Sequence, residues 1–158
     1  MPTQAYRPEK RFFTDQDFDR MSWHENPVHA IAFGPAPAEL SLDIDYIFRK
    51  ATPATEKTTS SFWISPATLV FEGVFDLKLH HSGGASLTLL GIAREEVKPS
   101  ELRLPQKFWK WRIQCVEARW EFCATGYRQF IRRPPELVAR QRLELTERGD
   151  YVLVCPNR

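Results

Sequence analysis

Hydrophobic and polar residues alternate along most of this chain, and the alternation predicts β-strands. The clearest strand is Leu40–Phe48, which reads LSLDIDYIF. A period of two places the even-numbered residues, from Leu40 to Phe48, on one apolar face. We expect the opposite face, which holds Ser41, Asp43, Asp45 and Ile47, to be largely wet. Val28–Phe33 precedes it across a Pro-containing connection, so residues 28–48 are predicted to form a hairpin.

The same alternation returns further along the chain. The additional strands that we expect lie at Phe62–Ser65, Leu69–His80, Leu87–Ala93, Lys107–Glu117, Arg119–Ile131 and Tyr151–Val154. Pro66 should interrupt the first of these, and Gly73 should bend or divide the second. The strands on either side of Ala118 are predicted to form a hairpin, and residues 51–60 and 94–105 are predicted to be loops.

Two short helices complete the prediction. One begins after Thr14, which can cap it, and ends near Ser22; the other covers Glu136–Leu145. Because strands and helices do not alternate regularly, a parallel doubly wound sheet is disfavoured. The expected fold is mainly β (α+β), with a curled, mostly antiparallel sheet of about seven to nine strands that forms a sandwich or open barrel.

The length and composition favour one globular domain. The chain has 158 residues, of which 42% are hydrophobic, and it can bury a core without a disulfide or a structural metal. We expect residues 1–12 to be a flexible N-terminal arm that lies on the surface, and residues 13–158 to be a single globular β-rich domain. The odd number of cysteines and the absence of a long apolar run indicate a cytoplasmic protein with reduced thiols and no membrane segment.

Charge is unevenly distributed although the net charge is only +2. Residues 14–45 contain seven acids and one base, whereas residues 94–142 contain twelve bases and six acids. The favoured interpretation is that the two regions lie close together and neutralise each other. The alternative is that one of them forms a charged binding face.

The densest polar chemistry lies between Trp23 and Phe48. Its members are His24, Glu25, His29, Asp43 and Asp45. If these side chains converge, they could bind a metal or provide the acid and base of a hydrolase. The structural interpretation is favoured, because acids on the wet face of a strand are ordinary and protect a sheet edge. No residue is therefore assigned as catalytic or as a metal ligand. The adjacent His80 and His81 point to opposite strand faces and make a poor metal site.

A second group of residues combines cations and rings. Its members are Lys110, Arg112, Arg128, Phe130, Arg132 and Arg133. Single-stranded nucleic acid would need them on one exposed sheet face. The alternation instead places Trp109 and Trp111 opposite Lys110 and Arg112, which indicates that the tryptophans belong to the core. Nucleic acid binding is thus the weakest of the functions considered.

The sequence Trp23-His24-Glu25, followed by Leu42-Asp43-Ile44-Asp45-Tyr46-Ile47, resembles a pattern of small uncharacterised bacterial proteins. A later segment similar to Phe62–Phe71 belongs to the same pattern, and the resemblance covers residues 22–80 best. Glu25 stands where the pattern has Asp. Such proteins are similar to toxin-immunity-type β-rich domains, and this resemblance implies a module that works by binding.

We therefore expect a cytoplasmic bacterial protein that is a non-catalytic binding or interaction module. It would mask a protein partner through its acidic or its basic region, without a cofactor and without a membrane. A metal-dependent or acid–base hydrolase is the alternative, and single-stranded nucleic acid binding is the third hypothesis. No nucleophile elbow and no phosphate-binding glycine loop is present to favour another chemistry.

Overall fold

The structure is built almost entirely from antiparallel strands. The computed structural model describes residues 5–34, 36–51, 60–84, 87–98 and 107–149. Within these residues the strands are β1 (Phe12–Thr14), β2 (Pro27–Phe33), β3 (Leu40–Ala51), β4 (Ser61–Glu72), β5 (Phe75–His81), β6 (Leu87–Val97), β7 (Phe108–Cys115), β8 (Ala118–Ala124), β9 (Gly126–Ile131) and β10 (Glu136–Val138). A 3-10 helix spans Asp15–Arg20, and the helix α2 spans Leu145–Arg148.

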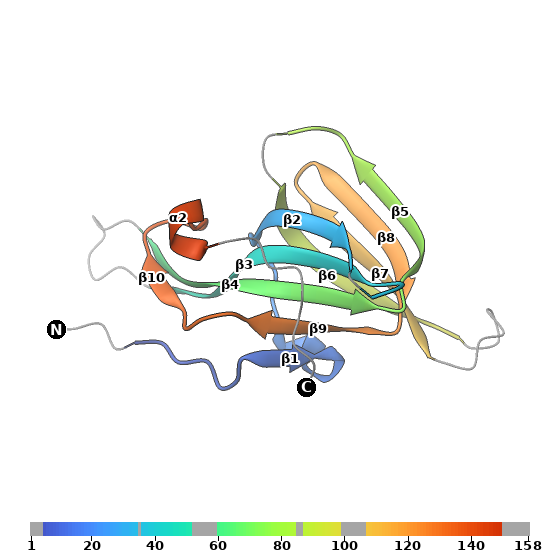
Figure 1. The fold of residues 1–158 in the computed structure, drawn as a ribbon, viewed down its shortest axis with the longest axis horizontal. Coiled ribbons are helices and arrows are strands. Elements are labelled where there is room, and N and C mark those ends of the chain that lie inside the picture. Colours follow the sequence, from blue (N-terminus) through green and yellow to red (C-terminus); the bar gives the residue numbers. More distant parts are fainter. Residues whose placement is uncertain (1–4, 35, 52–59, 85–86, 99–106, 150–158) are drawn as a thin grey trace.

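These ten strands of the described residues form one sheet that curls into two layers. The order is β1-β9-β4-β3-β2-β6-β7-β8-β5, and β10 is added to β4. The first layer runs from β1 to β2 and the second from β6 to β5. Strand pairing between the described residues of the two layers occurs where Pro27 and Val28 pair with Thr88 and Leu87. Figure 1 shows β5 and β8 rising away from β3, β4 and β9. The expected curled, mainly β fold is confirmed, and the sheet does not close into a barrel.

The hydrophobic core lies between the two layers, where the alternation placed it. Trp111 is fully buried at its centre, with its ring 5.1 Å from Phe71 and 6.0 Å from Tyr127. The edge-to-face contacts match the preferred geometry of aromatic pairs. Cys115 and Cys123 are buried free thiols, and Cys155 lies outside the described residues.

The first predicted helix and both predicted hairpins are confirmed. Thr14 and Asp17 form a capping box at the start of the 3-10 helix, and Phe18 of this helix packs 5.6 Å from Trp111. β2 pairs with β3, and β7 pairs with β8. The described part of the N-terminal arm lies on the surface of the sheet, where the ring of Tyr6 is 5.5 Å from that of Phe48.

The predicted break at Pro66 is wrong, because β4 runs through this residue without interruption. The N–H of Arg132 donates to the carbonyl of Pro66, so the proline nitrogen also points toward the β9 side of β4. The strand β9 ends at Ile131, so its ladder with β4 has ended where Pro66 lacks an N–H. No ladder hydrogen bond to β9 is lost there. A proline is tolerated at such a position.

The predicted helix at Glu136–Leu145 is also wrong. The strand β9 pairs only with the second half of β4. Glu136–Val138 pairs with the first half, along the same edge, and forms β10. Tertiary pairing thus overrides a weak helical pattern, and helix begins only at Leu145. The strand β6 also extends past its predicted end to Val97, because residues 94–97 pair with β7. The predicted strand at residues 151–154 lies outside the described residues.

Gly73 divides β4 from β5, as predicted, and its conformation requires glycine. Its φ is +63°, and an added Cβ would lie 3.3 Å from Thr125. We expect Gly73→Ala to lower the free energy of unfolding by about 1–2 kcal/mol, because L-residues are strained in the left-handed region. Urea denaturation measures this loss. Gly91→Ala is the matched control, since its Cβ would contact nothing within 4 Å. Equal losses in both variants would contradict this explanation.

Candidate functional site

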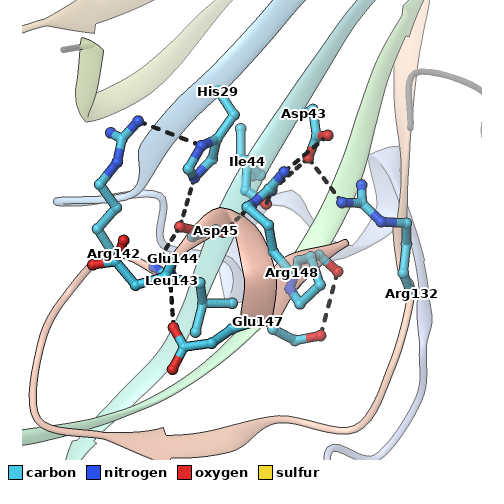
Figure 2. Close-up of polar contacts among 12 residues, drawn as sticks. His29, Asp43, Ile44, Asp45, Arg132, Arg142, Leu143, Glu144, Glu147 and Arg148 are labelled. Carbon is cyan, nitrogen blue, oxygen red and sulfur yellow. Dashed lines mark hydrogen bonds and ion pairs between the residues drawn. The ribbon is translucent and has the colours of Figure 1, made fainter. Parts of the chain in front are cut away.

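The acidic face of β3 is buried, so the expectation of a wet face is wrong. Asp43 and Asp45 are both 0% exposed. They point away from the hydrophobic core, onto the outer face of the first layer, where the chain between β10 and the end of α2 covers them (Figure 2). Two carboxylates buried in this way require cations and hydrogen-bond donors close by.

Arg148, the last residue of α2, supplies the principal cation. Its side chain is fully buried. Nη1 and Nη2 donate to the two oxygens of Asp43 at 3.1 and 2.6 Å, and Nε donates to Asp45 Oδ1 at 3.1 Å (Figure 2). The period of two places both carboxylates on one side of β3, within the span of one planar guanidinium. A lysine could not reproduce this fork.

Arg132 supplies the second cation. Its Nη2 donates to Asp43 Oδ1 at 3.0 Å, and its Nη1 donates to the hydroxyl of Thr68 at 3.0 Å. Burial lowers the pKa of Arg132, and the nearby charge of Arg148 adds to this, while Asp43 opposes it. The cluster therefore holds two guanidinium groups against two carboxylates, and its charges balance.

His29 joins the cluster through Asp45. Its Nε2 lies 2.7 Å from Asp45 Oδ2, and its side chain is only 2% exposed. The guanidinium of Arg142 lies 3.4 Å from Nδ1 and can only donate. Nδ1 therefore accepts, and Nε2–H donates to Asp45. The register of β2 shifts between Val28 and Ala30, and this bulge aims His29 at the cluster.

The four carboxylate oxygens of Asp43 and Asp45 are all engaged. The second oxygen of Asp45 also accepts from the N–H of Leu143 at 2.9 Å. Burial alone would raise the pKa of Asp45, but hydrogen bonds from His29 and Leu143, together with the charge of Arg148, hold it below its ordinary value. A metal ion at this point would have to displace two arginines. In the described part of the chain, no three His, Cys, Asp or Glu side chains are grouped as a metal site would require.

The other two members of the predicted polar group lie apart from this cluster. His24 is exposed, and its Nδ1 lies 3.0 Å from the carbonyl of Leu90. Glu25 is exposed as well, and it accepts from Gln141 Nε2 at 2.6 Å. The two side chains are 3.9 Å apart and face solvent. The structure thus brings together His29, Asp43 and Asp45, without His24 and Glu25.

The predicted basic-aromatic group is divided between two faces. Lys110 and Arg112 lie on the outer face of the second layer, because Trp111 between them points into the core. Arg128, Phe130 and Arg132 lie on the outer face of the first layer. Apart from Lys110, the cations also pair with carboxylates: Arg112 pairs with Glu121 at 3.1 Å, Arg128 with Glu39 at 3.0 Å and Glu72 at 2.8 Å, and Arg133 with Glu136 at 3.9 Å. The single exposed face that nucleic acid binding required is absent from this group.

Three ion pairs join the acidic region to the basic region, which agrees with the favoured interpretation that the two regions lie close together. Asp15 pairs with Arg94 at 2.5 Å, Glu39 with Arg128 at 3.0 Å, and Asp43 with Arg132 at 3.0 Å. Each pair joins residues 14–45 to residues 94–142. The adjacent His80 and His81 do not converge, and His81 instead lies 2.9 Å from the carbonyl of Gly83.

Arg148 and Leu143 are the site residues that sequence reasoning missed. Arg148 is 105 residues from Asp43 in the sequence. A lone arginine in a charged stretch carries no local signal of burial. Two acids two residues apart on an otherwise apolar strand could have indicated that a buried cation was needed.

No protein-family model, curated protein or solved structure matches this chain. No helix in the described residues is both long and apolar enough to span a membrane.

Replacing Arg148 should destabilise the fold more than replacing any exposed arginine. We expect Arg148→Met to cost about 3–5 kcal/mol of unfolding free energy, because it strands two buried carboxylates. Urea denaturation measures the cost, and Arg140→Met, at a partly exposed arginine of the same segment that does not contact the cluster, should cost less than about 1 kcal/mol. Adding Asp43→Asn and Asp45→Asn to Arg148→Met should recover part of the loss. A recovery of zero would contradict the ion-pair explanation.

The low pKa of Asp45 makes stability depend on pH. Its folded-state value lies below the ordinary 3.8, so its contribution is full above about pH 4 and is lost as the pH falls through the folded-state pKa. Asp45→Asn should therefore be less stable at neutral pH, and its stability should decline less steeply in acid. Urea denaturation from neutral pH to about pH 2 checks this. Parallel declines for both proteins would show that Asp45 is not responsible.

Proposed function

We propose that this protein is a non-catalytic binding module that accepts an extended strand of a partner protein along β2. The observation that carries the proposal is the exposure of two large apolar side chains on this strand. Phe33 is 70% exposed and Ile31 is 36% exposed. Contiguous exposed apolar residues on a sheet edge are a recognised sign of protein interaction.

Among the described residues, residues 31–33 of β2 have no strand on the side away from β3, although β2 lies in the middle of the sheet. Within the described residues, the strand β2 pairs with β6 only at its start, at Pro27 and Val28, whereas its pairing with β3 continues to Phe33. The N–H of Gly34 donates to the carbonyl of Glu39, which fixes the alternation of the ladder. The backbone N–H and C=O groups of Ala30 and Ala32 therefore point toward β3. The corresponding groups of Ile31 and Phe33 point away from β3.

This free edge lacks the usual protection against strand addition. Residues 30–33 read Ala-Ile-Ala-Phe, without a charge or a proline. Beside them is a groove of about 450 Å³ between the β2–β3 turn and the start of β5, lined by Phe33, Pro37, Val74 and Phe75. Backbone hydrogen bonds to the edge and one side chain in the groove correspond to the β-augmentation mode of peptide recognition.

The proposal keeps the expected class, an immunity-like module of a bacterial cytoplasm, but moves its contact surface. The acidic and basic regions pair with each other, and the oxygens of Asp43 and Asp45 are saturated by arginine, histidine and a backbone N–H. His29, the only histidine near them, is almost completely buried. These observations favour a scaffold role for the polar cluster over the hydrolase alternative.

Short linear peptides selected by display on the immobilised protein test the proposal. We expect selected peptides to alternate apolar and polar residues, and to bind at least about tenfold more weakly to Phe33→Lys. Val116→Lys is the matched control, because Val116 is 61% exposed but lies at the β7–β8 turn. It should bind like the wild type.

Hydrogen exchange locates the contact. Bound peptide should slow exchange of the amides of Ile31 and Phe33, while those of Ala30 and Ala32 are already protected by β3. Protection elsewhere, or peptides that bind Phe33→Lys unchanged, would refute the proposed surface. If the wild type sediments as a dimer and Phe33→Lys sediments as a monomer, the partner is a second copy of the chain and not another protein.

A further inference from the structure

A pocket with aromatic walls lies at the end of β3 that is remote from Phe33. It is bounded by Tyr6 and Phe13 of the N-terminal stretch and by Tyr46 and Phe48 of β3, and it encloses about 250 Å³. This volume is below the usual range of about 300–1,000 Å³ for larger ligands, so the pocket suits a small molecule. It is independent of the proposed β2 surface.

Three aromatic rings of the lining contact one another. Tyr46 and Phe48 meet edge to face at 4.9 Å, and Tyr6 lies 5.5 Å from Phe48. Phe48 is the extra residue of a bulge in β3, since the register with β4 shifts between Ile47 and Arg49. Bulges redirect side chains and are frequent beside binding sites.

The hydroxyl of Tyr46 lacks a good acceptor. Tyr46 is 5% exposed, its O–H donates to the thioether of Met21 at 3.7 Å, and it accepts from the N–H of Ser22 at 3.4 Å. A thioether is a weak acceptor, so the proton of this buried hydroxyl is poorly satisfied by the described residues. Burial raises the pKa of Tyr46 to about 12, and the group therefore remains a donor at neutral pH. An oxygen of a ligand would satisfy it better.

The rim of the pocket supplies one available cation. Lys10 is occupied by Asp17, whereas Arg20 is exposed and makes no ion pair with any described residue. Glu9 and Asp17 are the acidic groups of the lining; Lys10 pairs with Asp17, and the charge of Arg20 also acts on it. Glu9 excludes an anion from its own side. An anionic group in this pocket would therefore turn toward Arg20.

We propose that this pocket binds a small aromatic carboxylate. Its ring lies among Tyr6, Phe13 and Phe48, and its carboxylate accepts from the hydroxyl of Tyr46 and pairs with Arg20. The hydrophobic walls provide affinity, and the two polar groups provide orientation, as in most small-molecule sites.

Titration of the full-length protein with 2-naphthoate, followed by amide chemical shifts, tests this site. We expect saturable changes confined to residues around the pocket. Tyr46→Phe and Arg20→Gln should each weaken binding about tenfold, because each removes one polar contact to a charged group. Arg119→Gln, on the outer face of the second layer, should leave binding unchanged. Tyr46→Phe keeps the ring, and an unchanged thermal melt will confirm that it folds.

The uncharged analogue 2-naphthalenemethanol separates the carboxylate from the ring. The wild type should bind this alcohol at least about tenfold more weakly than 2-naphthoate. The Arg20→Gln variant should bind the two compounds equally. Equal affinity of the two compounds for the wild type would overturn the assignment of a carboxylate. Shifts that cluster around Phe33, or the absence of saturable binding at millimolar 2-naphthoate, would overturn the site itself.

Discussion

The pairing of Arg148 with Asp43 and Asp45 is the interaction on which the outer face of the first layer depends. Two adjacent carboxylates in a central strand cannot be buried unless cations meet them. Arg148 meets both with one guanidinium, and this holds the chain from β10 to α2 against the sheet. The segment from β10 to α2 covers Asp43 and Asp45, and these two aspartates hold the segment in place through Arg148. The position of the segment and the burial of the aspartates therefore depend on each other.

The same constraint explains why a group of residues with catalytic character does not form an exposed site. His29 and Asp45 have the geometry of an orienting histidine–carboxylate pair, at 2.7 Å. Such a pair acts on a substrate only if the second imidazole nitrogen is accessible, and here the guanidinium of Arg142 lies against it. The pair instead ties β2 to β3 and to Leu143. Polar residues that resemble a site can thus be retained because they fix how a segment packs, a structural role known for some buried networks.

Local alternation predicted most strands, because the faces of a strand depend only on the order of its own residues. Trp111 was placed in the core correctly for this reason. What covers the second face of a strand is decided by distant residues. The acids of β3 were therefore expected to be wet, and the covering Arg148 had no local signal. Likewise, β10 forms because β9 ends early and leaves an edge of β4 free, which depends on the lengths of strands that are not neighbours in sequence.

The polar cluster also determines where binding surfaces can lie. The middle of β3 is fixed on its inner side by the core and on its outer side by two arginines, so it offers nothing to a partner. Both proposed surfaces lie at its ends, beside Leu40 and beside Phe48. Each is next to an irregular part of the ladder: the pairing of β2 with the described residues of β6 ends at Val28, and β3 bulges at Phe48. Interrupted pairing leaves backbone groups or re-aimed side chains without partners inside the sheet, and these are the groups that a ligand can satisfy.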